Sequence, residues 1–127
     1  MARIESHRDL IAWQKGMELA AEAYRLGKVM PRAEEHRLTS QLLRAAASVP
    51  ANIAEGHARG TRKDYANFIN IARGSLAETE TFLMLAVKVG LLDAKATVAA
   101  LSLCTELSKI LTALLFRLRE SPLESSP

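Results

Sequence analysis

The sequence predicts an all-α protein folded as an antiparallel up-down-up-down four-helix bundle. Apolar residues recur at spacings of three and four over four long stretches, which is the periodicity of amphipathic helices. Aromatic residues make up only 5% of the chain, whereas Ala and Leu are abundant, and this composition suits closely packed helices. Short segments with Gly or Pro separate the stretches, so consecutive helices are expected to be antiparallel neighbours. The sequence has no alternation typical of strands and no internal repeat.

The first helix is expected to begin near Asp9 as its N-cap and to end between Gly27 and Met30. One apolar stripe with heptad-like spacing is expected to face the core. This stripe comprises Leu10, Trp13, Met17, Ala20, Tyr24 and Gly27.

The second helix is expected to run from about Ala33 through Glu55. Its core stripe comprises Leu38, Leu42, Ala45, Val49 and Ile53. Pro50 removes one helical hydrogen bond and crowds the carbonyl of Ala46, at a cost of about 3 kcal/mol unless the helix bends. We therefore predict that the second helix is kinked at Pro50.

The third helix is expected to open at Thr61, with Asp64 close to a capping-box position, and to end near Val89 ahead of Gly90. Its buried side is predicted to comprise Tyr65, Phe68, Ala72, Leu76, Leu83, Ala86 and Val87.

The fourth helix is expected to start at Asp93 as its N-cap and to run to about Arg119. One face comprises Leu101, Cys104, Leu107, Leu111, Leu114 and Leu118. Ile110, Leu115 and Phe116 fall outside that face, and a helix that is apolar nearly all round is central to a fold or covered by another subunit. This surplus favours self-association over a monomer.

The chain of 127 residues is expected to form one domain that buries about two thirds of its unfolded surface. We expect an N-terminal tail over 1–8, the bundle over 9–120 and a disordered tail over 121–127. The net charge of +3 is compatible with nucleic acid without requiring it. Cys104 is the single cysteine, the first residues lack the apolar segment of a signal peptide, and no uninterrupted apolar run has the ~18 to 20 residues that span a bilayer. A cytoplasmic protein without a membrane partner is expected.

A row of polar residues interrupts the apolar pattern of the second helix and has a counterpart on the third. One interpretation is a structural hydrogen-bond network between helices or subunits, and the other is a ligand or nucleic-acid site with Arg44 and Arg73 as phosphate contacts. We favour the network, with Glu78 and Arg73 as the expected partners. The predicted polar cluster comprises Ser48, Asn52, Glu55, Ser75 and Glu78.

Basic residues gather between the second and third helices, next to a helix N-terminus that favours anions. This turn is either a phosphate-binding site or a solvated surface, and the sequence gives the two equal weight. The candidate nucleic-acid contacts over the whole chain are Arg37, Arg44, Arg59, Arg62, Lys63 and Arg73.

The sequence contains no recognisable motif of catalysis or metal binding. None of the three histidines, His7, His36 and His57, follows a Glu by three residues, as di-iron bundles require, and Cys104 has no second Cys with which to form a metal motif. The spacing of Arg and His also differs from that of helical-bundle ribonucleases. We therefore predict no catalytic residue, no metal and no cofactor.

The sequence resembles the bacterial four-helix bundle proteins encoded in intervening sequences of 23S ribosomal RNA genes. The resemblance covers roughly 9–118 and depends on two ordered motifs. The first is Ser-x-Pro-x-Asn-x-x-Glu-Gly, here 48–56, and the second contains Phe68, Ala72, Gly74, Ser75 and Glu78. The chain also resembles the accessory subunit of diversity-generating retroelements. That resemblance implies a homopentamer that binds nucleic acid and a reverse transcriptase.

Two functions are expected from these observations. The first is a non-enzymatic homo-oligomer that associates with RNA or DNA, or with a ribonucleoprotein, through basic residues. The alternative is a protein-interaction scaffold, or an accessory subunit, whose oligomer binds a partner polypeptide such as a reverse transcriptase.

Overall fold

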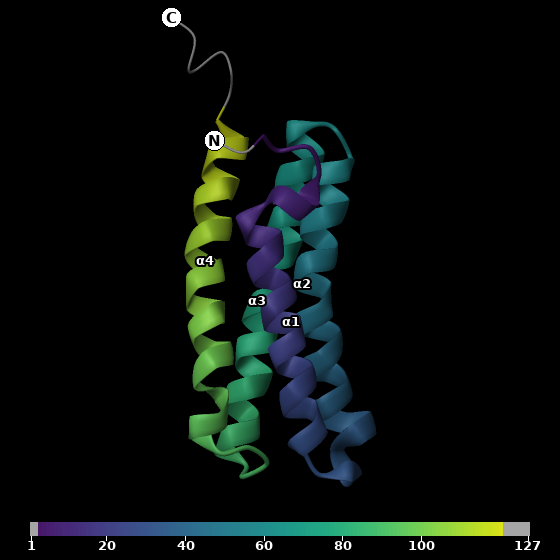
Figure 1. Ribbon diagram of the computed structural model, residues 1–127, viewed down its shortest axis with the longest axis vertical. Helices are drawn as coiled ribbons and strands as arrows, with labels where there is room; N and C mark the ends of the chain where they lie inside the picture. The colour runs from purple at the N-terminus through teal and green to yellow at the C-terminus, as the bar shows by residue number, and fades with distance from the viewer. Residues whose placement is uncertain (1–2, 121–127) are drawn as a thin grey trace, which may run out of the picture.

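The computed structural model describes residues 3–120 and confirms the all-α prediction for that range. Figure 1 shows the four long helices side by side, with the chain direction reversing from each helix to the next. The helices are α1 (Ile11–Val29), α2 (Ser40–Ala58), α3 (Arg62–Lys88) and α4 (Val98–Arg119). The expected tail over 121–127 lies outside the described residues.

The structure begins α1 later than the sequence suggested, so the prediction of Asp9 as its N-cap is wrong. A 3₁₀ turn, η1 (His7–Asp9), precedes α1 and is capped by Ser6. The Asp9 carboxylate accepts the backbone N–H groups of Glu5 at 2.9 Å and Ser6 at 3.2 Å, and these hydrogen bonds lower the pKa of Asp9. Residues 6–9 therefore belong to a capped turn.

The second helix also begins later than expected. A 3₁₀ turn, η2 (Arg32–Glu34), and a π-helical turn, η3 (Glu35–Thr39), replace its first residues. Within η3 the backbone of Arg37 departs from helical geometry, at φ −114° and ψ −112°. A π turn re-aims the side chains that follow it, and here Leu38 and Thr39 are buried. The helical assignment of α2 is continuous through Pro50, and the predicted kink at Pro50 stays a prediction.

The N-cap of α3 is Thr61, as predicted, whereas the N-cap of α4 is Thr97 and the prediction of Asp93 as its N-cap is wrong. The Thr61 hydroxyl accepts the Asp64 N–H at 3.1 Å at the start of α3. The Asp93 carboxylate accepts the Lys95 N–H at 3.1 Å and caps a 3₁₀ turn, η4 (Ala94–Thr97), that leads directly into α4. Gly90 has φ +82°, the left-handed conformation that glycine adopts readily after a helix.

The core lies between all four helices and confirms the stripe predicted for α2, whose five residues are all buried. The stripe predicted for α1 is wrong: Met17 and Tyr24 are 47% and 53% exposed. The buried positions of α1 are Ala12, Gly16, Leu19, Ala23 and Leu26. Ala12, Gly16 and Ala23 are small enough to let the helix axes approach closely. A Cβ on Gly16 would lie only 3.3 Å from Pro50 Cβ.

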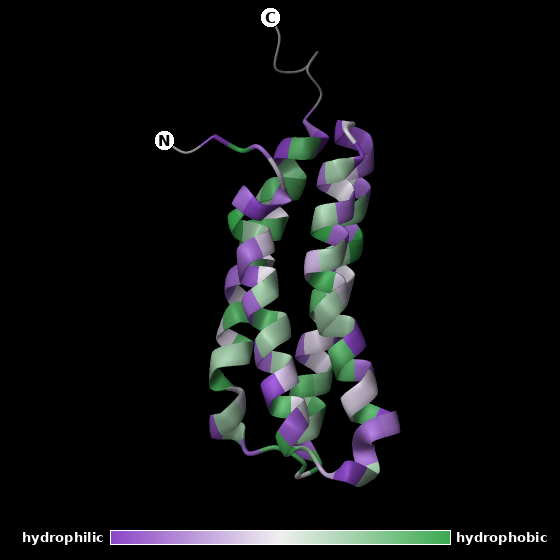
Figure 2. Cartoon of the chain, turned by 45° about the vertical axis from the view of Figure 1, so that its right-hand side comes forward, coloured by the Kyte–Doolittle hydropathy of each residue, from purple (hydrophilic) through white to green (hydrophobic). Residues whose placement is uncertain are grey.

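The residues of the predicted α1 stripe form a second apolar row that is only partly buried. At its end, Gly27 approaches the side chains of Thr39 and Leu43, which lie before and within α2. Figure 2 shows that hydrophobic and hydrophilic residues alternate along every helix.

The surplus apolar surface of α4 is smaller than predicted. Leu115 is buried and Ile110 is partly buried against the core, whereas Phe116 is 71% exposed. Among the described residues, Ala94–Arg119 is the one helical stretch long and apolar enough to cross a membrane, a criterion that core helices also meet. In this bundle α4 supplies Cys104, Leu107 and Leu111 to the core.

Candidate functional site

Three of the five predicted polar-cluster residues form a hydrogen-bonded group between α2 and α3. The hydroxyls of Ser48 and Ser75 lie 2.8 Å apart. The Asn52 amide donates to both the backbone oxygen and the hydroxyl of Ser48, each at 2.8 Å. Ser75 is buried, so the group joins the two helices where a nonpolar contact would otherwise be expected.

The structure does not bring the remaining predicted partners into this group. Glu55 forms an ion pair with Arg59, with Nε and Oε2 2.8 Å apart. Arg73 donates to the Asn70 side chain at 3.2 Å, so its expected role in the cluster is wrong. Glu78 lines a hollow of about 280 Å³ with Arg44, at the outer edge of the α2–α3 contact.

The six candidate cations are spread over the bundle. Arg37 lies in η3 at one end of the bundle and is paired with Glu34, whereas Arg44 and Arg73 lie further along α2 and α3. Arg59, Arg62 and Lys63 remain together at the opposite end, where α2 meets α3. The sequence-predicted contacts therefore do not form one continuous surface.

The end of α4 adds two cations that the sequence analysis missed. The Arg62 guanidinium donates to the backbone carbonyls of Arg117 and Leu118, and thereby caps the last turn of α4. Lys63 and Arg119 line one open hollow of about 580 Å³ between α3 and α4. We call the group Arg59, Arg62, Lys63, Arg117 and Arg119 the cation cluster.

An aromatic group lies beside the cation cluster. The Arg59 guanidinium stands 4.9 Å from the centroid of the Phe68 ring, and the rings of His57 and Tyr65 meet edge to face at 5.6 Å. Burial raises the pKa of the Tyr65 hydroxyl, partly offset by the charge of Arg117. Among the described residues this hydroxyl has no hydrogen-bond partner.

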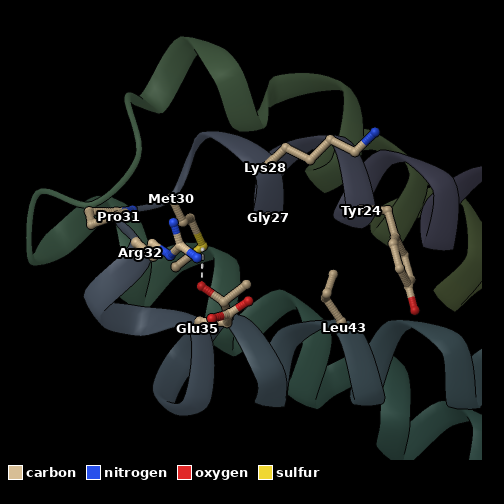
Figure 3. A pocket seen from close by; sticks show the side chains of 9 residues that line it. Tyr24, Gly27, Lys28, Met30, Pro31, Arg32, Glu35 and Leu43 are labelled. Atoms are coloured by element: carbon tan, nitrogen blue, oxygen red, sulfur yellow. Dashed lines mark hydrogen bonds between the residues drawn. The ribbon is translucent and has the colours of Figure 1, made fainter.

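A separate cavity of about 460 Å³ opens between α1 and α2 at the opposite end of the bundle from the cation cluster. Figure 3 shows Tyr24 and Leu43 at one end of this cavity, Met30, Arg32 and Glu35 at the other, and Gly27 between them. The buried Thr39 hydroxyl donates to the Met30 sulfur at 3.6 Å beneath it. We call this cavity, together with the exposed residues Met17 and Tyr24, the α1–α2 groove.

The environment of Cys104 disfavours the reactive thiolate form of its side chain. Burial raises the pKa of its thiol to about 12, with a further contribution from the charge of Glu80. Among residues 3–120, no three His, Cys, Asp or Glu side chains lie together as metal ligands would.

These features define a class of protein: an all-α bundle whose polar residues join helices or gather at helix ends. Residues 8–113 match the 23S rRNA-intervening sequence protein family, and the chain belongs to that family.

One solved structure with the same fold is a protein of unknown function from the S23 ribosomal protein family of Bacteroides thetaiotaomicron VPI-5482. It is 27% identical to this chain with a TM-score of 0.76, over 83% of this chain and 98% of that one. No curated protein matches the chain.

Proposed function

We infer that this chain is a non-enzymatic, self-associating bundle of the cytoplasm that binds structured RNA through the cation cluster. The observation that carries this proposal is the meeting of Arg59, Lys63, Arg117 and Arg119 from three helix ends at one end of the bundle. Phosphate contacts of this kind supply affinity without reading sequence.

Most residues of the cation cluster also have a structural role that does not require RNA. Arg117 and Arg119 lie in the last turn of α4, where positive charge offsets the helix dipole, and Arg59 is paired with Glu55. Lys63 has neither role, because it stands in the first turn of α3, where a cation is unfavourable for the helix. An anionic partner would offset this unfavourable interaction of Lys63 with the helix dipole.

Binding of a structured RNA, measured by fluorescence anisotropy over a salt series, tests the proposal. Affinity should fall steeply with salt, and Lys63→Glu combined with Arg119→Glu should weaken binding to all RNAs alike and reduce the salt slope. The matched control is Lys88→Glu with Lys95→Glu, which removes the same charge at the other end of the bundle. Equal losses from both pairs, or no binding at low salt, contradict the proposal.

A second candidate function is a scaffold or accessory subunit for a partner polypeptide, such as a reverse transcriptase. The exposed apolar residues on α1 and α3 favour this function. A protein partner that stays bound to the chain after nuclease treatment, and is lost with an apolar surface variant, would support it. The homopentamer implied by the retroelement resemblance is tested by sedimentation equilibrium, which gives the subunit count.

A further inference from the structure

Phe116 is the most exposed large hydrophobic residue among residues 3–120, at 71%. It follows the buried Leu115 in α4, and the partly buried side chains of Leu114 and Leu118 pack against the core on that helix. The core therefore does not use the Phe116 ring. Phenylalanine is also a weaker helix former than leucine or lysine. Neither packing nor helix propensity explains this aromatic residue.

A single exposed apolar residue is common on protein surfaces, so its surroundings decide whether it has a role. Phe116 precedes Arg119 by three residues, and the two side chains therefore lie on the same side of α4. Arg119 lines the open hollow between α3 and α4 together with Lys63 and Asn67. Phe116 thus stands beside this hollow, one turn further from the end of the bundle.

The levels of α3 and α4 along the bundle agree with this placement. The open hollow brings residues 63–67 beside 118–119, and a second hollow brings residues 73–80 beside 104–108. Because the two helices are antiparallel (Figure 1), Phe116 is level with about Asn67. Asn67 and Asn70 are both exposed on α3. An exposed ring on one helix is therefore level with exposed amides on the other.

Arg62 fixes the two helix ends to each other at this point. Its guanidinium donates to the backbone carbonyls of Arg117 and Leu118, which follow Phe116 directly. The turn of α4 that carries the ring is thereby held against the start of α3. A surface that is ordered before its ligand arrives loses little conformational entropy on binding.

The charges around the hollow favour an anionic ligand. The five side chains of the cation cluster outnumber the acids next to them, Glu55, Asp64 and Glu120. Asp64 lines the hollow itself, where its carboxylate repels phosphate. The same carboxylate, like the Asn67 amide, can accept hydrogen bonds from the N–H groups of a nucleic-acid base. Unpaired bases offer these groups and an open ring face for stacking, whereas a double helix does not.

We propose that Phe116 and the hollow between α3 and α4 bind an unpaired segment of RNA. Phe116 stacks on one base, and Lys63 and Arg119 bind the phosphates beside it. Asp64 and Asn67 accept hydrogen bonds from the edge of the neighbouring base. The proposal rests on the RNA binding inferred above and adds the kind of RNA, a duplex with an unpaired extension.

Fluorescence anisotropy with two RNAs tests this proposal. One RNA is a blunt duplex, and the other is the same duplex with about six unpaired nucleotides at one end, within the range of a single-strand site. The wild type should bind the extended RNA more tightly. Phe116→Leu should weaken that complex about five- to hundredfold, the range for one stacking aromatic residue, and should leave the affinity for the blunt duplex unchanged. Phe116→Trp should keep the preference.

The salt dependence distinguishes stacking from charge. Phe116→Leu removes no charge, so its salt slope for the extended RNA should equal that of the wild type, whereas Lys63→Glu with Arg119→Glu should reduce the slope. Tyr24→Leu is the matched control, because Tyr24 is an exposed aromatic residue of α1 at the opposite end of the bundle. It should bind both RNAs as the wild type does.

The outcomes separate this proposal from the proposed function. If the wild type binds both RNAs equally, or if Phe116→Leu keeps the preference, the stacking site is overturned and binding through the cation cluster remains. If Phe116→Leu weakens self-association in sedimentation velocity and changes neither RNA affinity, Phe116 belongs to a contact between copies and the stacking site is likewise overturned. A wild type that binds neither RNA at low salt overturns the proposed function itself.

Discussion

Gly56 and Gly74 both belong to the sequence motifs of the chain, yet they occupy opposite environments. A Cβ on Gly56 would lie 2.7 Å from the Cβ of Phe68 and 3.2 Å from a ring carbon of Tyr65. A Cβ on Gly74 would meet nothing within 4 Å. Gly74 therefore makes no close helix contact, and Gly56 is the position where α2 and α3 need a missing side chain.

Alanine substitutions distinguish the two glycines. Gly56→Ala should lower the free energy of unfolding by about 1 to 3 kcal/mol, because the added methyl group overpacks the α2–α3 contact. Gly74→Ala should raise it by about 0.5 to 1 kcal/mol through helix propensity alone. Urea denaturation at low protein concentration measures both, and a destabilised Gly74→Ala would contradict an open environment at that position.

The buried thiol of Cys104 gives a second prediction at the residue scale. Its pKa of about 12, against 9.0 for an exposed thiol, leaves almost no thiolate near pH 8. Reaction with a disulfide reagent at pH 8 should therefore proceed only through unfolding and accelerate in urea. Fast modification of the folded chain would contradict the burial.

The same shift in pKa makes stability depend on pH. Because the pKa is raised on folding, the contribution of the thiol is fully present below about pH 9 and is lost as the pH rises toward 12. Cys104→Ala should remove this part of the alkaline decline, which denaturation curves at pH 8 and pH 10.5 would measure.

At the scale of elements, the sequence predicted that four helices form better than it predicted where they begin and which faces they bury. The stripe of α2 was right because it is the single stripe of large apolar residues on that helix. α1 carries two parallel seams with the same spacing, and the larger side chains, Met17 and Tyr24, belong to the outer one. The inner seam contains the small residues Ala12, Gly16 and Ala23, which allow a neighbouring helix to pack closely. Such positions can be recognised only from the packed structure.

The start of α2 was unpredictable for a related reason. Residues 32–39 have helical composition, but the chain enters through η2 and a π turn that bury Leu38 and Thr39. The Thr39 hydroxyl bonds to Met30, nine residues earlier in sequence. Local propensity contains no information about such a contact.

Arg62 joins two elements and predicts a measurable local effect. Its guanidinium caps carbonyls at the end of α4, so Arg62→Ala should cost about 0.5 to 1.5 kcal/mol, the net value of a hydrogen bond. Amide exchange should become faster in the last turn of α4 and in no other helix. Lys63→Ala, next to it, has no such carbonyl contact among the described residues and should leave that turn protected.

At the scale of the whole molecule, the candidate site depends on topology. Arg59, Arg62 and Lys63 are adjacent in sequence and were identified from it, whereas Arg117 and Arg119 join them only because α4 ends beside the start of α3. Whether an apolar residue is covered depends on the placement of all four helices.

Self-association predicts that stability depends on protein concentration. A partner that binds only the folded chain stabilises it by mass action. The Tm of the wild type should therefore rise over a hundredfold increase in protein concentration. Scanning calorimetry at several concentrations provides the measurement, and a Tm that does not change with concentration would contradict self-association.

An even number of antiparallel helices has a practical consequence for handling this chain. The capped turn at His7 and the last turn of α4 lie at the same end of the bundle (Figure 1). A short engineered linker between them, with new termini opened near Gly90, would give a circular permutant that keeps every helix contact. Such a permutant would free the neighbourhood of Arg119 from any fused tag and would let the bundle be immobilised from its other end.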